Sequence, residues 1–302
     1  MTKKRPTLTI GIPAFNEAAN IASLLGSLLS QRQVDFELSN IIVYSDASTD
    51  GTQKEVMSVN SELVSLSQSS TRIGKPVITN FIFSHSNTDI VVVLDADIQI
   101  KSSSFIEELV LPIVNGQADL TSGKITELNA ITFIEKVLKT SMEVKRELFE
   151  SYKHGANIYT CHGRSRAFSR RFYTSFTALT QVAADDAYSY LSCKQLGFVY
   201  QYTPKAVLQY RLPQTLRDHL RQSNRFFQGN QQLLRYVKPE VVGDAFALPL
   251  SLQASTLAKF LVTQPLHFVF YIGILVYSKL QSLISPTITS TWNIATSSKV
   301  LK

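Results

Sequence analysis

Hydrophobic residues follow two different spacings in the first hundred residues, and these spacings predict strands and helices in alternation. The continuous apolar runs Leu8–Ile12 and Asn40–Tyr44 predict buried strands, the first of them ending at Pro13. Between them, apolar residues recur at i, i+3, i+4, i+7 and i+8 from Ile21, which predicts an amphipathic helix. The β-branched run Asp89–Leu94 predicts a third strand, apolar on both faces and therefore central in a parallel sheet.

This order of elements predicts an α/β fold with a mostly parallel central sheet. In such folds the loops at the carboxyl ends of the strands form the binding crevice. From about residue 104 to 160 the pattern is helical and polar, with Phe133, Val137 and Leu138 on one face. That stretch contains no motif that points to chemistry.

The chain becomes apolar after residue 241. Residues 246–284 contain no acid and only two basic residues, Lys259 and Lys279. A membrane-spanning helix needs about 20 mostly apolar residues, and Pro265 with its polar neighbours interrupts this run. The pattern therefore fits one marginal span or two helices lying in the membrane plane, with a buried helix of the globular domain as the alternative. The Ser/Thr-rich tail, 286–302, is expected to be flexible.

Composition and charge narrow the classes of partner. Hydrophobic residues make up 44% and charged residues 18% of the 302 positions, which excludes a wholly disordered chain. The net charge is +7, and residues 151–302 hold 17 of the 30 basic residues but only 5 of the 23 acidic ones. This asymmetry favours an anionic partner such as a phosphate or an anionic lipid. No nucleic-acid-binding motif accompanies it, so nucleic acid is not an expected partner.

Two further features bear on the compartment. Cys161 and Cys193 are too few for a disulfide framework and lack metal-ligand spacing, which fits a reducing environment. The N-terminus is basic but lacks the apolar core of a signal peptide, so we do not expect secretion.

Candidate chemistry begins at the ends of the predicted strands. Asp95 and Asp97 follow a buried strand and could both reach one divalent cation, and hard oxygen ligands suit Mg²⁺ or Mn²⁺. Asp46 ends the preceding strand and could accept a hydrogen bond from a nucleobase or ribose. Arg72 and Lys75 form a basic turn suited to a phosphate or a nucleobase edge. Taken singly, each has a simpler explanation: acids that solvate a turn or cap a helix, and a solvated basic loop.

The order of motifs resembles a known family, the nucleotide-sugar glycosyltransferases of family 2, which have the GT-A (Rossmann-like) fold. Four segments carry the resemblance in the first half of the chain: Pro13–Glu17, Ser45–Thr52, Gly74–Lys75 with Asn80, and the Asp95–Asp97 pair, which is similar to the family's metal-binding DxD. In the second half, Gly163–Arg171 resembles an acceptor-side loop, and Asp185–Asp186 resembles the family's Glu-Asp motif. Gln222–Phe226 is similar to the Gln-x-x-Arg-Trp motif of membrane-linked synthases. The resemblance covers about residues 7–230.

Three positions depart from the family pattern. Ser45 replaces an aspartate, so nucleoside contact rests on Asp46 and Glu17. Asp185 replaces glutamate and keeps the charge on a shorter arm. Phe226 replaces tryptophan, which keeps an aromatic face for a sugar but loses the indole N–H donor.

The resemblance implies a role for each matching residue. Asp186 is the expected general base, and the apolar approach Val182–Ala184 could raise its pKa by desolvation. Gln222 and Arg225 are spaced i, i+3 on an expected helix, share a face and could hold the diphosphate. The full expectation is as follows: catalytic Asp186; donor-binding Pro13, Phe15, Glu17, Asp46, Arg72, Lys75, Asp95, Gln222 and Arg225; acceptor-side Gly163, Asp185 and Phe226; and metal ligands Asp95 and Asp97 for Mg²⁺ or Mn²⁺.

The leading interpretation is an inverting, metal-dependent glycosyltransferase that takes a sugar from a UDP- or GDP-type donor. Its expected acceptor is a lipid-linked or membrane-proximal saccharide, and its expected place is the cytoplasmic face of a membrane, peripheral or single-span. Residues 1–240 would form the catalytic domain, 241–285 a membrane-associated segment and 286–302 a tail. The alternatives are a retaining GT-A transferase, a nucleotidyltransferase, or a non-catalytic nucleotide-binding scaffold of the same fold.

Overall fold

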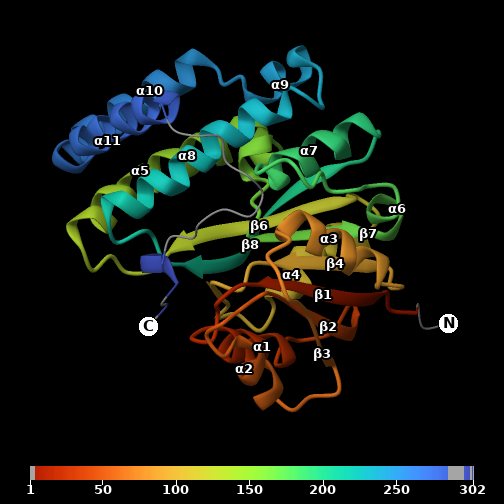
Figure 1. The fold of residues 1–302 in the computed structure, drawn as a ribbon. Coiled ribbons are helices and arrows are strands. Elements are labelled where there is room, and N and C mark those ends of the chain that lie inside the picture. Colours follow the sequence, from red (N-terminus) through yellow and green to blue (C-terminus); the bar gives the residue numbers. More distant parts are fainter. Residues whose placement is uncertain (1–3, 285–295, 300, 302) are drawn as a thin grey trace.

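The protein is built on one eight-stranded sheet with helices on both faces (Figure 1). The computed structural model describes residues 4–284, 296–299 and 301. The strands follow the order β3-β2-β1-β4-β7-β6-β8-β5 across the sheet. Their bounds are β1 (Thr7–Ala14), β2 (Glu37–Asp46), β3 (Val64–Ser69), β4 (Ile90–Leu94), β5 (Ile98–Gln99), β6 (Leu120–Glu127), β7 (Ser165–Ser169) and β8 (Tyr200–Tyr210).

Helices connect the strands and continue beyond the last one. The α-helices are α1 (Ile21–Leu29), α2 (Thr52–Ser58), α3 (Lys75–Ser84), α4 (Phe105–Val114), α5 (Phe133–Ser151), α6 (Arg170–Tyr173), α7 (Asp185–Gln195), α8 (Leu216–Leu233), α9 (Pro239–Phe246), α10 (Leu250–Thr263) and α11 (Pro265–Ile284). Three short 3₁₀ turns, η1 (Tyr152–Gly155), η2 (Ile158–Thr160) and η3 (Thr296–Ser298), complete the described elements.

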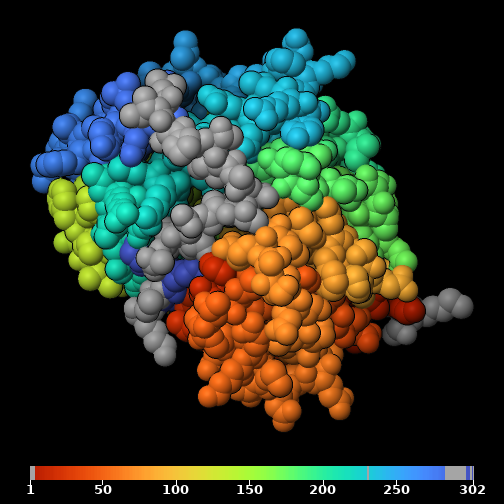
Figure 2. Space-filling view, viewed as in Figure 1, coloured from red at the N-terminus to blue at the C-terminus, as the bar shows by residue number. Residues whose placement is uncertain are grey.

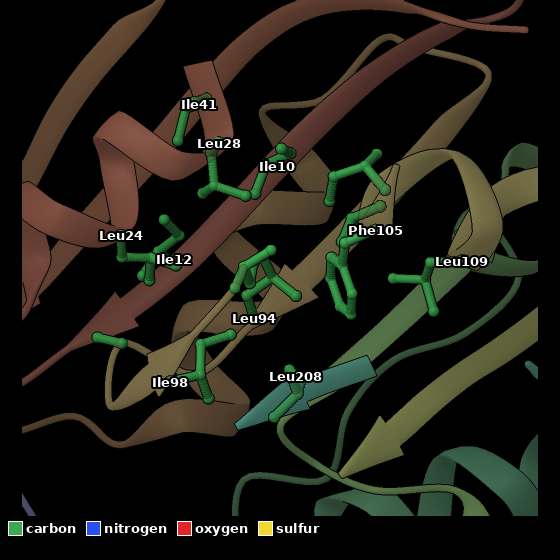
Figure 3. Close-up of a cluster of buried hydrophobic side chains, with 14 of the residues drawn as sticks. Ile10, Ile12, Leu24, Leu28, Ile41, Leu94, Ile98, Phe105, Leu109 and Leu208 are labelled. Carbon is green, nitrogen blue, oxygen red and sulfur yellow. The ribbon is translucent and has the colours of Figure 1, made fainter. Parts of the chain in front are cut away.

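Two hydrophobic cores lie on opposite faces of the sheet. Figure 3 shows one of them, in which Ile10 and Ile12 of β1 meet Leu24 and Leu28 of α1. Alternate residues of β4 enter opposite cores, since Val92 belongs to this one while its neighbours Val91 and Val93 belong to the other. The prediction that β4 is apolar on both faces and central in the sheet is confirmed.

The sheet is mostly parallel, as predicted, but it contains two antiparallel strands. Strands β3, β2, β1 and β4 are mutually parallel, and so are β6 and β8. Strand β7, however, runs antiparallel to both β4 and β6, and β5 runs antiparallel to β8. The break at β7 separates a parallel first half from the second half of the sheet.

The hydrophobic pattern predicted the start of one helix correctly and the end of one strand incorrectly. The amphipathic helix predicted from Ile21 is α1, which buries four of its apolar residues. The expectation that the first strand ends at Pro13 is wrong: β1 runs to Ala14, because its pairing with β2 continues after its pairing with β4 has stopped at Gly11.

Strand β6 was not predicted in the polar stretch 104–160. Its sequence, LTSGKITE, is rich in small polar residues. Their hydroxyls are satisfied inside the core, where Thr121 donates to the Leu109 carbonyl (2.7 Å) and Ser122 donates to the Ser165 carbonyl (2.9 Å). Because these buried side chains are polar and hydrogen-bonded, the sequence of β6 lacks the hydrophobic periodicity from which a strand is predicted.

The apolar C-terminal helices pack along α5, where Figure 1 draws them beside α8. Phe260 of α10 and Phe268 and Tyr271 of α11 form a third small core with α5. Among the described residues, one helical stretch, Pro239–Thr263, is long and apolar enough to cross a membrane. That stretch is divided at residues 247–249 into α9 and α10, so it is not one straight helix.

Gly123 on β6 provides a test of sheet packing. A Cβ at this position would lie 2.6 Å from the Ala206 carbonyl oxygen on the neighbouring strand, and backbone cannot move aside as a side chain can. We expect Gly123→Ala to destabilise the fold by about 1–3 kcal/mol.

The control is Gly26→Ala on α1, where a Cβ would meet nothing within 4 Å. There the substitution should stabilise by about 0.5–1 kcal/mol, because glycine costs more backbone entropy in a helix than alanine. Urea denaturation measures both variants. Equal effects at the two positions would contradict the packing described for β6.

Candidate functional site

Hydrogen bonds from backbone to side chain join the loops that follow β1 and β2. The Asn16 N–H donates to the Ser48 hydroxyl at 3.0 Å, and the Glu17 N–H donates to the Thr52 hydroxyl at 2.8 Å. Asn16 itself has a φ of 52°, a left-handed conformation that asparagine adopts more readily than most residues. The loop after β2 therefore fixes the conformation of the loop after β1.

Asp46, the last residue of β2, is buried and holds a basic loop in place. Its carboxylate accepts hydrogen bonds from the Arg72 Nε (2.9 Å) and from the N–H groups of Ile73 (2.7 Å) and Gly74 (3.1 Å). The Arg72 guanidinium in turn lies 3.5 Å from the centroid of the Phe15 ring, a cation–π contact. Asp46 thus orients Arg72, and Arg72 with Phe15 forms a flat surface in the crevice.

Asp95 and Asp97 follow β4, and each has a cation beside it. The Lys75 ammonium forms a short ion pair with Asp95 and donates to the Gly163 carbonyl at 2.7 Å. The Arg164 Nη1 lies 3.1 Å from Asp97 Oδ1 and 3.9 Å from Asp95 Oδ2. Both carboxylates keep about a quarter of their side-chain surface exposed, so they remain accessible from the crevice.

The donor set fits a divalent cation that is shared with a ligand. Two accessible carboxylates one residue apart supply the hard oxygen ligands that Mg²⁺ or Mn²⁺ prefers, and Mg²⁺ in proteins commonly completes its shell with water and substrate phosphates. In the part of the chain that the structure describes, no group of three or more His, Cys, Asp or Glu side chains could hold a metal alone. A cation at Asp95 and Asp97 would therefore depend on ligands from a bound molecule.

A pocket of about 150 Å³ brings most of the predicted donor residues together. Of the residues predicted from the sequence, nine line it: Pro13, Phe15, Glu17, Asp46, Arg72, Lys75, Asp95, Asp97 and Arg225. Five segments far apart in the sequence therefore contribute to one cavity at the carboxyl ends of β1, β2 and β4.

Asp185 and Asp186 open α7, and their environments differ. The Arg166 guanidinium lies 2.5 Å from Asp185 Oδ2 and also donates to the Asp185 carbonyl. Burial alone would raise the pKa of Asp185, but the charge of Arg166 lowers it to about 2. Burial and the neighbouring charge of Asp185 raise the pKa of Asp186. One carboxylate of the pair is therefore held ionised while the other can exchange a proton at milder pH.

Asp186 is not among the residues that line this pocket, but Gly163 brings it near Lys75, the partner of Asp95. A Cβ placed on Gly163 would be 3.5 Å from Asp186 Oδ2 and 3.5 Å from the Lys75 ammonium, which itself contacts Asp95. Gly163 thus lies between the two acidic motifs. Their proximity links the predicted acceptor side of the site to the predicted metal side.

The segment that leads into α7 is apolar and is held by two hydrogen bonds to one side chain. Val182, Ala183 and Ala184 are buried, as the desolvation of Asp186 requires. The Asn80 side chain donates to the Ala178 carbonyl (2.9 Å) and accepts from its N–H (2.8 Å). Asn80, the end of the Gly-Lys-x-x-x-x-Asn resemblance, therefore anchors this segment to α3.

Helix α8 contributes one predicted residue to the pocket and places two others outside its lining. Arg225 lines the pocket, and burial lowers its pKa against the opposing charges of Asp185 and Asp186. Gln222 lies one turn earlier on the same helix and is half-buried. Phe226 is 54% exposed and contacts the Phe227 ring, so its part in acceptor binding stays a prediction.

Two site residues were not identified from the sequence. Arg164 lies within the Gly163–Arg171 segment but was given no role of its own. Lys299 belongs to the tail that was expected to be flexible, yet its ammonium pairs with Glu17 Oε1 at 2.6 Å inside the pocket. Burial raises the pKa of Glu17 to about 7 even though Lys299 lowers it. No local pattern marks either cation, since each finds its partner across more than 60 residues.

Comparison with known proteins identifies the family. Residues 9–175, more than half of the chain, match the model of glycosyl transferase family 2. A probable glycosyltransferase of Bacillus subtilis (strain 168), YdaM, is 25% identical over 285 residues. That match covers 90% of this chain and 65% of the relative, so the chain spans less than two thirds of that protein's length.

Solved structures share the fold. A mannosyltransferase from Pyrobaculum calidifontis, in complex with GDP-Man and Mn²⁺, has a TM-score of 0.66 at 20% identity and covers 93% of this chain and 88% of its own. Glucosyl-3-phosphoglycerate synthase from Mycobacterium tuberculosis, in complex with Mn²⁺, UDP-Glc and phosphoglyceric acid, has a TM-score of 0.57 at 20% identity, with 82% of each chain covered. The GT-A-like α/β fold predicted from the motifs is confirmed.

The buried Arg166–Asp185 pair provides a test of how the site is held together. We expect Arg166→Met to lower the free energy of unfolding by about 3–5 kcal/mol, because it leaves Asp185 buried without a counter-charge. Arg32→Met is the control, since Arg32 is 60% exposed and pairs with Glu107 at the surface. Its effect should stay below about 1 kcal/mol. If urea denaturation shows that both variants lose a similar free energy of unfolding, the buried pair stabilises the fold no more than a surface pair does.

Proposed function

We propose that this chain moves a sugar from a nucleoside diphosphate sugar to a hydroxyl and inverts the configuration of the anomeric centre. The chain belongs to glycosyl transferase family 2 and is a glycosyltransferase. One observation carries this proposal. Asp186, whose pKa is raised, and Lys75, which pairs with Asp95, both lie close to Gly163. A metal-dependent inverting transfer needs one acidic group for the cation and another for the acceptor proton.

The donor is of UDP or GDP type. In support, structures with the same fold are bound to GDP-Man or UDP-Glc. In this chain the flat surface of Phe15 and Arg72 suits a nucleobase. Lys75 and Arg225 supply positive charge for the diphosphate, and Gln222 extends that side one helical turn along α8.

A divalent cation is the proposed cofactor, and Asp95 and Asp97 would hold it. Mn²⁺ or Mg²⁺ is present in the related structures alongside nucleotide or nucleotide sugar. When bound, such a cation neutralises charge that develops on a departing diphosphate. Without it, Lys75 and Arg164 balance the two carboxylates.

Asp186 acts as the general base. Its raised pKa makes it a better proton acceptor than an ordinary aspartate, while Asp185, paired with Arg166, stays ionised and does not compete for the proton. In the transfer, the acceptor oxygen forms a bond to the anomeric carbon as the bond from that carbon to the diphosphate oxygen breaks. The acceptor proton passes to Asp186.

The acceptor is lipid-linked or membrane-proximal, and the enzyme works at the cytoplasmic face of a membrane. The support is the outer face of α10 and α11, defined as their exposed apolar side chains other than those that pack on α5. Its members are half exposed or more: Leu250, Leu261, Val262, Leu266, Val269, Val276, Tyr277 and Leu280. Exposed apolar residues on paired helices, with one buried side each, favour helices that lie in the interface rather than span it.

Asp186→Asn tests the catalytic assignment. We expect it to reduce kcat at least about 100-fold, the usual order for removing a general base, while nucleotide binding changes less than about threefold. In the wild-type enzyme, kcat/KM should fall as the pH drops through the raised pKa of Asp186, since only the ionised form accepts a proton. Asp35→Asn is the matched control, because Asp35 is an exposed loop aspartate. This variant should leave kcat and nucleotide binding unchanged.

The configuration of the product separates inversion from its alternatives. NMR of the transferred sugar should show the anomeric configuration opposite to that of the donor. Retention of configuration, or near-normal transfer by the Asp186→Asn enzyme, would contradict the role of Asp186 and favour a retaining transferase.

The outer face of α10 and α11 can be tested with vesicles. We expect Val262→Glu with Leu266→Glu to reduce binding to vesicles of phosphatidylglycerol and phosphatidylcholine at least fivefold, because charged side chains enter an apolar interface poorly. Met57→Glu is the control, because Met57 is 71% exposed but lies on α2. Unchanged sedimentation of the double variant with vesicles would contradict the membrane assignment.

A further inference from the structure

The end of the chain returns to the donor pocket. Figure 2 shows the dark-blue C-terminal residues between the N-terminal half of the molecule and the teal α8. In detail, the Lys299 ammonium donates to the Glu17 carboxylate (2.6 Å), to the Asn16 carbonyl (3.0 Å) and to the Phe15 carbonyl. The Asn20 side chain donates to the Lys299 carbonyl at 2.5 Å. The whole loop after β1 therefore closes around one lysine.

Ser297, two residues before Lys299, connects the same segment to α8 on the opposite side of the crevice. The Ser297 hydroxyl donates to Asp218 on α8 at 2.5 Å, and the Ser297 N–H donates to the same oxygen at 3.2 Å. Ser297 also accepts from the Gln214 N–H (3.2 Å), just before α8 begins. Residues 297–299 thus connect the loop that carries Phe15 to the helix that carries Arg225.

The position of Lys299 indicates what it does and does not do. An ammonium group has three N–H donors, and Lys299 has one acceptor for each of them. Two of those acceptors are backbone carbonyls of the loop that presents the Phe15 ring, and the third is the buried Glu17. The Lys299 ammonium therefore uses its three N–H donors to hold the loop and does not point at a phosphate site.

The loop after β2 holds the other side of the same loop, because it accepts hydrogen bonds from the N–H groups of Asn16, Glu17 and Ala18. Asn16 adopts a left-handed backbone conformation, which costs energy unless its surroundings maintain it. The loop after β2 supports it from one side, and Lys299 supports it from the other. The Arg72 guanidinium lies on the Phe15 ring, so a displaced loop would also displace the surface proposed for the nucleobase.

We propose that Lys299 is a positioning residue of the donor site, which holds the Phe15–Glu17 loop at a fixed distance from α8 so that the nucleoside of the donor binds. This inference rests on the proposed function, since it assigns the nucleoside to that loop. It places residues 297–299 within the catalytic unit, although the resemblance to the family ended near residue 230.

Three variants test the role of Lys299. In Lys299→Ala the loop loses three hydrogen bonds and keeps the bond from Asn20 to the backbone carbonyl of residue 299. We therefore expect the Kd for the nucleoside diphosphate with Mn²⁺, and the KM for the donor, to rise about tenfold. The kcat at saturating donor should change less than threefold, because Asp186 and the Asp95–Asp97 pair are untouched. Lys299→Arg keeps the charge and the donors and should recover most of the affinity.

Lys54→Ala is the matched control, because it removes an exposed lysine from α2 and should leave Kd and KM unchanged. Calorimetry with UDP and GDP in the presence of Mn²⁺ gives Kd, and initial rates give KM and kcat. The melting temperature of each unliganded variant, expected to stay within about 3 °C of the wild type, shows that the fold is retained.

The outcomes are distinct. A Kd for Lys299→Ala within twofold of the wild type overturns the inference and leaves the proposed function standing. Tighter binding by Lys299→Ala also overturns it, and would show that the C-terminal residues obstruct the pocket. Equal losses in Lys299→Ala and Lys299→Arg overturn it as well, since a positioning cation should be replaceable. If the wild type binds no nucleotide with Mn²⁺, the proposed function itself fails, and the inference fails with it.

Discussion

The structure depends on basic residues that neutralise the negative charge of carboxylates, which the topology brings together at one edge of the sheet. Parallel strands β1, β2 and β4 bring their carboxyl ends together, so acidic side chains from separate loops would repel one another in a half-buried crevice. A basic residue lies beside each of five of them. The pairs are Glu17–Lys299, Asp46–Arg72, Asp95–Lys75, Asp97–Arg164 and Asp185–Arg166. Asp186 has a raised pKa in the same environment, which distinguishes it from the five.

This pairing changes the meaning of the charge asymmetry between the two halves of the chain. The basic second half was interpreted as a surface for an anionic partner. Several of its cations instead neutralise acids of the first half inside the fold, as in Arg164–Asp97, Arg211–Glu135 and Lys299–Glu17. The asymmetry is therefore partly structural: in two of the five crevice pairs, Asp97–Arg164 and Glu17–Lys299, the acidic half supplies the carboxylate and the basic half supplies its counter-ion.

The sequence allowed the first half to be predicted better than the second, for a physical reason. Helix α1 and strand β4 are specified by local hydrophobic spacing, and the Asp95–Asp97 pair is recognisable within three residues. Strand β6 is specified by buried hydroxyls whose partners lie on other strands, so its polar sequence resembled a helix. The roles of Arg164 and Lys299 depend on partners 67 and 282 residues away, which no local pattern encodes.

The central claim is that the crevice between β1, β4 and α8 binds a nucleoside diphosphate through a metal at Asp95 and Asp97. The most direct measurement is the melting temperature with UDP, GDP, dTDP or CMP, each with and without Mn²⁺ or Mg²⁺, because a ligand that binds the native state raises it. The account predicts that UDP or GDP raises the melting temperature only when the metal is present, and that Asp97→Asn abolishes the rise. No rise with any nucleotide, or an equal rise without metal, would contradict the account, and the former would favour a non-catalytic scaffold.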